Sequence, residues 1–260
     1  MSKRPVARRH FINLNSPPSA GLQRGPADKE GLLREVVRSS LLSVTTDALI
    51  ALSGATAGAA GIITIAGTGS ISYGRNAAKK SARAGGWGYI YGDEGGGFDL
   101  TRQAIRALLR NEEGWGPETI LRQMLLGETG ASNANDLMHR LYTDSYPRPR
   151  IASFAKLVDE AAIHGDNVAR NIIMNAAQQL AGTTSAVRTQ LFDEFEQAEV
   201  AYIGGVFRSE MLLERFRMLV ELETGNRVIA PRFGPAVGAL LEAYALAGLS
   251  VVLTDAPGEK

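Results

Sequence analysis

The sequence contains no cysteine among its 260 residues. This absence excludes disulfides, thiolate nucleophiles, and zinc or iron–sulfur sites built on cysteine ligands. An excess of charge of one sign is also lacking, because 28 basic residues balance 27 acidic ones. The chain therefore lacks the electrostatic footprint of a nucleic-acid-binding protein. Histidine is scarce and without metal-ligand spacing, so no metal site is predicted from His10, His139 and His164.

A charge-free stretch, residues 48–74, has the length of a membrane span. Glycine, serine and threonine interrupt it throughout, whereas a spanning helix needs about 20 predominantly apolar residues. The basic N-terminus MSKRPVARRH leads into no apolar segment, so a secretory signal is not predicted. These features predict a cytoplasmic protein with no membrane partner.

The apolar pattern predicts an α/β protein with a helix-rich middle. The segment GIITIAGTGSISYG, residues 61–74, predicts a β-hairpin with a tip of small residues. Helices are predicted from near residue 28 and over residues 48–56, 98–110, 151–162, 167–192, 209–221 and 235–247. Further strands are predicted over residues 41–46, 200–205 and 227–230.

The hairpin tip, Gly67-Thr68-Gly69-Ser70, is a candidate phosphate-binding loop. Glycine lets backbone N–H groups approach an anion closely, and the hydroxyls of Thr68 and Ser70 add donors. The alternative interpretation is a plain hairpin turn.

Residues 81–97, SARAGGWGYIYGDEGGG, predict an irregular functional loop, because they are too rich in glycine for a regular element. Trp87 offers an aromatic face to apolar C–H groups, and Asp93 and Glu94 can accept hydrogen bonds from hydroxyls, which is a combination suited to a sugar. The alternative is that Trp87 is a buried anchor and the two acids cap the helix that begins near Phe98.

Three further positions carry functional interpretations. Asp47 follows a predicted strand, where a carboxylate can act as a general base, or it is the N-cap of the next helix. Gly204-Gly205 joins a strand to a helix and suits an adenosine or a phosphate, or it is an ordinary tight connection. Gly234 and Gly238 either belong to a site or permit close helix packing.

The order of these motifs resembles the N-acetylglucosamine kinases of the BadF/BadG/BcrA/BcrD-type ATPases, within the actin-like ATPase and sugar kinase superfamily. The resemblance runs from about residue 41 to residue 248 and is most specific in the GWG…GDEG loop. It implies a pair of RNase-H-like domains that close over a cleft, ATP and Mg²⁺ as cofactors, an amino sugar as substrate, and a homodimer.

The resemblance also implies a role for each motif. Asp47 would be the catalytic base that takes the proton of the sugar 6-hydroxyl. Gly67, Thr68 and Gly69 would form the second phosphate loop. The sugar would be bound by Ser70, Gly86, Trp87, Gly88 and Asp93. The adenosine pocket would be lined by Gly204, Gly205, Gly234 and Ala236.

The N-terminal region departs from the family pattern. The family opens with an Asp-x-Gly-Gly-Thr turn that forms the first phosphate loop, and nothing in residues 1–40 matches it. We therefore expect residues 1–60 to be the remnant of an N-terminal RNase-H-like domain and catalysis to be impaired. Residues 61–233 would form the C-terminal domain with a helical insert, residues 234–248 a helix returning to the first domain, and residues 249–260 a tail.

Two alternatives to an amino-sugar kinase follow from the same residues. A non-catalytic sugar-binding or regulatory module would keep the Trp87 loop and lose phosphoryl transfer. An activator ATPase of 2-hydroxyacyl-CoA dehydratases would need a cysteine-held iron–sulfur cluster, which the composition excludes.

Overall fold

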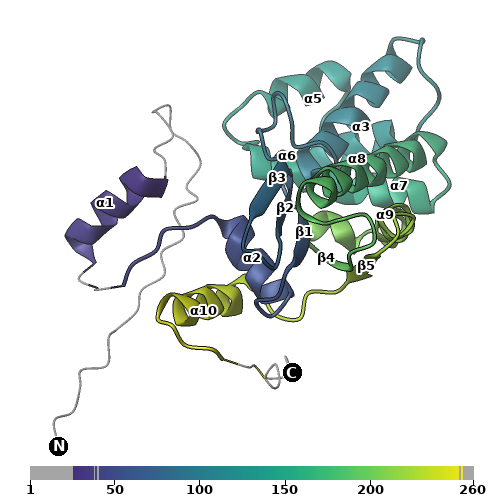
Figure 1. The fold of residues 1–260 in the computed structure, drawn as a ribbon. Coiled ribbons are helices and arrows are strands. Elements are labelled where there is room, and N and C mark those ends of the chain that lie inside the picture. Colours follow the sequence, from purple (N-terminus) through teal and green to yellow (C-terminus); the bar gives the residue numbers. More distant parts are fainter. Residues whose placement is uncertain (1–25, 38, 40, 252, 254–260) are drawn as a thin grey trace, which may run out of the picture. The chain divides into compact units, whose positions relative to one another are not determined.

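The computed structural model describes residues 26–37, 39, 41–251 and 253 (Figure 1). The chain divides into two compact units. The larger unit runs from Ala60 to Ile229, and the smaller unit is formed by the segments on either side of it.

The larger unit is built on a five-stranded sheet with the order β3-β2-β1-β4-β5. Its strands are β1 (Gly61–Ala66), β2 (Ser70–Arg75), β3 (Ser81–Gly85), β4 (Ala198–Ile203) and β5 (Asn226–Ile229). The first three strands are antiparallel neighbours, whereas β4 runs parallel to β1 and β5 parallel to β4. This mixed sheet with helices confirms the expected α/β, RNase-H-like fold class.

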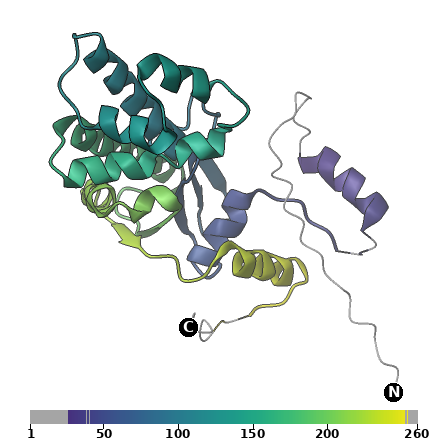
Figure 2. The ribbon, with the colours of Figure 1, turned by 180° about the vertical axis from the view of Figure 1, so that it is seen from behind.

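One long helix, α8 (Asn167–Leu191), packs against the sheet and confirms the helix predicted there. Its apolar stripe is buried, including Ile173 and Leu180. Hydroxyl groups also join it to the sheet, since the Oγ1 atoms of Thr64 and Thr184 lie 2.6 Å apart. Figures 1 and 2 show α8 beside the strands of this unit.

The helix-rich middle contains α3 (Gly97–Glu112), α4 (Leu121–Thr129), α5 (Ala134–Leu141), α6 (Arg148–Ala152) and α7 (Ala155–Ile163). The helix predicted over 151–162 is interrupted, because α6 ends at Ala152 and α7 begins at Ala155. After β4 come the short 3₁₀ helix η1 (Gly205–Arg208) and α9 (Glu210–Glu221). The expectation of no regular element in residues 81–97 is wrong at its start, because residues 81–85 pair with β2 as β3.

The smaller unit contains α1 (Pro26–Val36), α2 (Asp47–Ala55) and α10 (Pro235–Leu246). α2 and α10 pack backbone to backbone, because a Cβ built on Gly238 would lie 1.8 Å from the carbonyl oxygen of Ile50. The strand predicted over residues 41–46 is wrong: the segment is irregular and pairs with no strand of the described chain.

The uncharged stretch 48–74 forms α2, β1 and most of β2. Across the described ranges, no helix is both long and apolar enough to cross a bilayer.

Candidate active site

The tip of the β1–β2 hairpin is anchored on the first turn of α3. The N–H groups of Gly97 and Phe98 donate to the carbonyl oxygens of Gly67 and Thr68, at 2.8 and 3.0 Å. These bonds satisfy donors that the start of a helix otherwise leaves unpaired. The N–H groups of Thr68 and Gly69 donate to no group in the part of the chain that the structure describes. Two free donors at a fixed tip suit an anion such as a phosphate.

Asp93 links this tip to the glycine-rich loop. Asp93 is buried and has a left-handed backbone, with φ of 61°. Its Oδ1 accepts a hydrogen bond from the N–H of Gly88 at 3.3 Å. Its Oδ2 lies against Gly69, where a Cβ would be 2.3 Å away. One carboxylate therefore contacts both the predicted phosphate loop, at Gly69, and the predicted sugar loop, at Gly88.

Ser70 is buried and fixes the same loop from the other side. Its Oγ donates to the carbonyl oxygen of Glu94 at 2.6 Å, and its own carbonyl accepts from the N–H of Gly86 at 3.0 Å. The structure therefore places the Ser70 hydroxyl in a contact within the protein.

Trp87 is 71% exposed, so the interpretation as a buried anchor is wrong. The guanidinium carbon of Arg83 lies 4.5 Å from the centre of its ring. The idea that Asp93 and Glu94 cap α3 is also wrong, because Gly96 is the N-cap and no side chain caps this end. Asp99, in the first turn, accepts from the N–H of Gly95 at 3.1 Å.

Gly204 and Gly205 follow β4, the parallel neighbour of β1. Gly204 has a φ of 118°, and a Cβ there would lie 2.2 Å from the carbonyl oxygen of Ala66, so this position requires glycine. Gly205 lines a pocket of about 580 Å³ together with Gly67 and Thr68. The pocket thus opens at the carboxyl ends of two adjacent parallel strands, where ligands of α/β folds gather.

Charged side chains that the sequence analysis did not identify line the same pocket. Lys156 and Asp159 come from α7, and Arg208 from η1. The hydroxyl of Ser209 donates to the Asp159 carboxylate, and Lys156 pairs with Glu128 at 3.0 Å. No sequence motif marks these residues, because only the packing of α7 beside the strand ends brings them together.

The remaining predicted residues, Asp47, Gly234 and Ala236, belong to the smaller unit. Asp47 is exposed and is the first residue of α2, whereas the N-cap is Thr46, so the N-cap interpretation of Asp47 is wrong. Gly234 is the N-cap of α10 and contacts α2, since a Cβ on Gly54 would lie 2.4 Å from its carbonyl oxygen.

The comparisons with known proteins agree with this arrangement of motifs. An N-acetylmuramic acid/N-acetylglucosamine kinase of Clostridium acetobutylicum is 34% identical over 229 residues, which cover 86% of this chain and 74% of that protein. An N-acetyl-D-glucosamine kinase of Dictyostelium discoideum is 31% identical over 206 residues, which cover 76% of this chain and 64% of that protein.

Solved structures support the same fold. A Chromobacterium violaceum protein assigned to the N-acetylglucosamine kinases superimposes with a TM-score of 0.67 and 27% identity, over 82% of this chain and 70% of the other. A Porphyromonas gingivalis protein with the same assignment gives a TM-score of 0.56 at 24% identity, over 76% and 65% of the two chains, and shows the fold alone. The family model of the BadF/BadG/BcrA/BcrD ATPases matches residues 25–243, and the chain belongs to that family.

Proposed function

We propose that this chain is a sugar kinase that transfers a phosphoryl group from ATP to the 6-hydroxyl of an amino sugar, with N-acetylglucosamine as the first candidate. The observation that carries the proposal is the hairpin tip. The N–H groups of Thr68 and Gly69 have no partner among the described residues, Thr68 lines one pocket with Gly205, and Gly69 touches the Asp93 carboxylate. The proposed phosphate loop and the proposed sugar loop are thereby held against each other through Asp93. The kinases of Clostridium and Dictyostelium, which act on such sugars by name, support this choice of substrate.

ATP fits the residues of the pocket. Its volume of about 580 Å³ lies within the range of small-molecule sites. The N–H groups of Thr68 and Gly69 would hold phosphate oxygens. Lys156 and Arg208 line the pocket and would pair with the phosphates, and Asp159 and Glu160 line it as carboxylates. Phosphoryl transfer depends almost entirely on such positioning and on neutralising the phosphate charge.

The sugar would lie between Trp87 and the Asp93 loop. The exposed indole offers an apolar face, and the Gly86 and Gly88 backbone lets the ligand approach closely. Asp47 would accept the proton of the attacking hydroxyl, which is the usual task of a carboxylate base in this reaction. For Gly234 and Ala236, at the start of α10, we keep the adenosine-binding role that the family resemblance implies.

Mg²⁺ would bind with the nucleotide. Among the described residues no group of three or more histidine, aspartate or glutamate side chains is placed to hold a metal by itself. Magnesium in phosphoryl-transfer sites is held largely by phosphate oxygens, water and one or two carboxylates, so such a cluster is not required.

We further propose that the 260-residue chain turns over slowly, because only one phosphate loop, Gly67–Ser70, is identified in its sequence. Removing one preorganised donor from such a site costs on the order of 10²–10³ in rate. We also propose a homodimer, which the family resemblance implies, and a cytoplasmic location, which the sequence features predict.

A non-catalytic sugar-binding module is the second candidate, and the unmatched first phosphate loop favours it. Isothermal titration of the chain with N-acetylglucosamine, with and without ATP and Mg²⁺, separates the two. A kinase binds both the sugar and ATP and converts them to products. A non-catalytic sugar-binding module binds the sugar and does not bind ATP. Absence of sugar binding under both conditions would contradict both candidates.

A further inference from the structure

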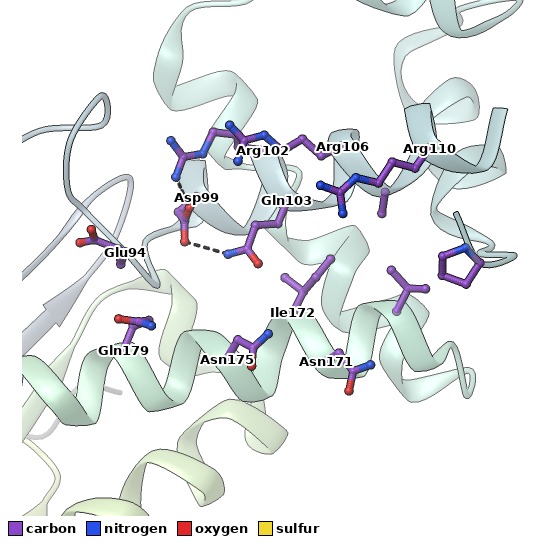
Figure 3. Close-up of a pocket in the computed structure, with 13 residues that line it drawn as sticks. Glu94, Asp99, Arg102, Gln103, Arg106, Arg110, Asn171, Ile172, Asn175 and Gln179 are labelled. Carbon is purple, nitrogen blue, oxygen red and sulfur yellow. Dashed lines mark hydrogen bonds and ion pairs between the residues drawn. The ribbon is translucent and has the colours of Figure 1, made fainter. Parts of the chain in front are cut away.

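A second pocket, of about 540 Å³, lies between α3 and α8. Figure 3 shows the two helices running along its sides. It shares no lining residue with the phosphate-loop pocket, because α3 turns one face to each. None of the roles assigned above uses this second pocket, which we call the α3–α8 groove.

Two rows of polar side chains line the groove, one on each helix (Figure 3). One row consists of guanidinium groups on α3: Arg102, Arg106 and Arg110. The other consists of carboxamides on α8: Asn171, Asn175 and Gln179. In each row the members are four residues apart, so they lie one above the other on a single helix face. Eight residues of helix span about 12 Å, which sets the length of each row.

The charge of the groove is positive toward the Arg110 end. The buried carboxylate of Asp99 is already engaged, with Arg102 at 2.5 Å and the amide of Gln103 at 2.9 Å. Arg106 is exposed and has no hydrogen bond or ion pair with any described residue. Arg110 lies over the ring of Trp115, at 4.9 Å from its centre.

The carboxamide row is also available to a ligand. Within the described ranges, the side chains of Asn171, Asn175 and Gln179 make no hydrogen bond. Each amide offers both donors and an acceptor, which is the combination that recognises hydroxyl groups. A guanidinium recognises phosphate oxygens by two parallel N–H···O bonds.

The groove adjoins the sugar loop through its own lining residues. Glu94, at one end of the groove, follows Asp93 directly, and its carbonyl accepts the Ser70 hydroxyl. Arg102 donates to the carbonyl oxygen of Tyr89 at 3.4 Å. A ligand that engaged Arg102 would therefore contact a residue that holds the loop carrying Trp87.

We propose that the α3–α8 groove binds a sugar phosphate as a second site, separate from the phosphate-loop pocket. The phosphate lies against Arg106 and Arg110, and the sugar hydroxyls hydrogen-bond to the carboxamide row. This inference goes beyond the proposed function and does not require phosphoryl transfer to occur.

The test is isothermal titration with N-acetylglucosamine 6-phosphate in a Trp87→Ala background, which removes the contribution of the proposed sugar site. Binding is expected to persist in that background and to weaken at least tenfold with Arg106→Ala or Asn175→Ala. Both side chains are exposed, so the melting temperature should not change. Arg217→Ala, an exposed arginine on α9 outside the groove, is the matched control and should have no effect.

Three results would overturn the proposal. These are inorganic phosphate binding as tightly as the sugar phosphate, affinity unchanged in Arg106→Ala, and binding abolished by Trp87→Ala alone. An ADP-release assay distinguishes failure of the second-site proposal from failure of the proposed kinase function. Arg106→Ala should leave basal turnover unchanged, and a chain without any turnover still gives a decisive binding result.

Discussion

The carboxylate of Asp93 occupies the space that a side chain on residue 69 would fill. A Cβ on Gly69 would lie 2.3 Å from Oδ2 of Asp93, and the other oxygen of that carboxylate accepts from Gly88 N–H. The phosphate tip and the loop carrying Trp87 are therefore positioned against each other. A glycine at position 69 is a requirement of this contact.

We expect Gly69→Ala to displace Asp93 and to weaken sugar binding or stability by about 1–3 kcal/mol, the usual cost of overpacking. Isothermal titration and thermal unfolding measure the two effects. Gly182→Ala on α8 is the control, since no atom lies within 4 Å of the Cβ it adds. That change should stabilise the chain by about 0.4–1 kcal/mol. Equal sugar affinity and equal thermal stability of the two variants would contradict the contact between Gly69 and the Asp93 carboxylate.

Trp87→Ala is expected to weaken sugar binding by about 1–3 kcal/mol, as for an aromatic anchor that becomes desolvated on binding. Because Trp87 is 71% exposed, the substitution should change the free energy of unfolding little. Trp115→Ala is the matched control, since Trp115 is 64% exposed and also lies under an arginine. Equal loss of sugar affinity in both variants would remove Trp87 from the site.

Asp47→Asn is expected to lower turnover by about 10²–10⁴-fold and to change sugar affinity little. A general base acts in the transition state, and an amide still hydrogen-bonds a hydroxyl. Steady-state kinetics of both proteins, with titration of the sugar, make the comparison. Turnover within a few-fold of the parent would mean that Asp47 serves only the first turn of α2.

Protonation of Asp136 on α5 should contribute to the loss of stability of the folded chain at low pH. Hydrogen bonds from Arg140 and from the N–H of Ser132 lower the pKa of Asp136 to about 2. Because the folded pKa lies below the unfolded value of about 3.9, this stabilisation is full above that pH and is lost as the pH falls toward 2. An NMR titration of the folded chain measures the pKa of Asp136. A titration midpoint near pH 4 would contradict the lowered pKa.

Elements with a strong local signal were predictable from the sequence. The hairpin of β1 and β2 follows from a β-branched run and a small turn, and α8 follows from a long apolar stripe. α4 was missed because it is short and no side chain caps its start at Ile120. The glycine content predicts that residues 81–85 belong to the loop, but pairing with β2 makes them a strand despite their weak propensity.

The sequence predicts residues of the candidate site only where they form contiguous motifs. Gly67, Trp87 and Asp93 belong to such motifs, and the hairpin tip and the glycine-rich loop are joined by the hydrogen bond from Gly86 N–H to the Ser70 carbonyl and by the Asp93 carboxylate. Lys156 and Arg208 were not identified, because their position depends on how α7 and η1 pack beside the strand ends. The prediction of a strand before Asp47 is wrong, because a segment with β-propensity forms no strand unless it pairs with another strand.

The most direct test of the account is detection of the phosphorylated sugar. The 260-residue chain is incubated with N-acetylglucosamine, ATP and Mg²⁺, and the product is followed by ³¹P NMR beside the Asp47→Asn variant. The account predicts slow formation of a sugar 6-phosphate, well below one turnover per second, and almost none with the variant. Sugar binding without any phosphorylated product, or product formed equally by the variant, would contradict it.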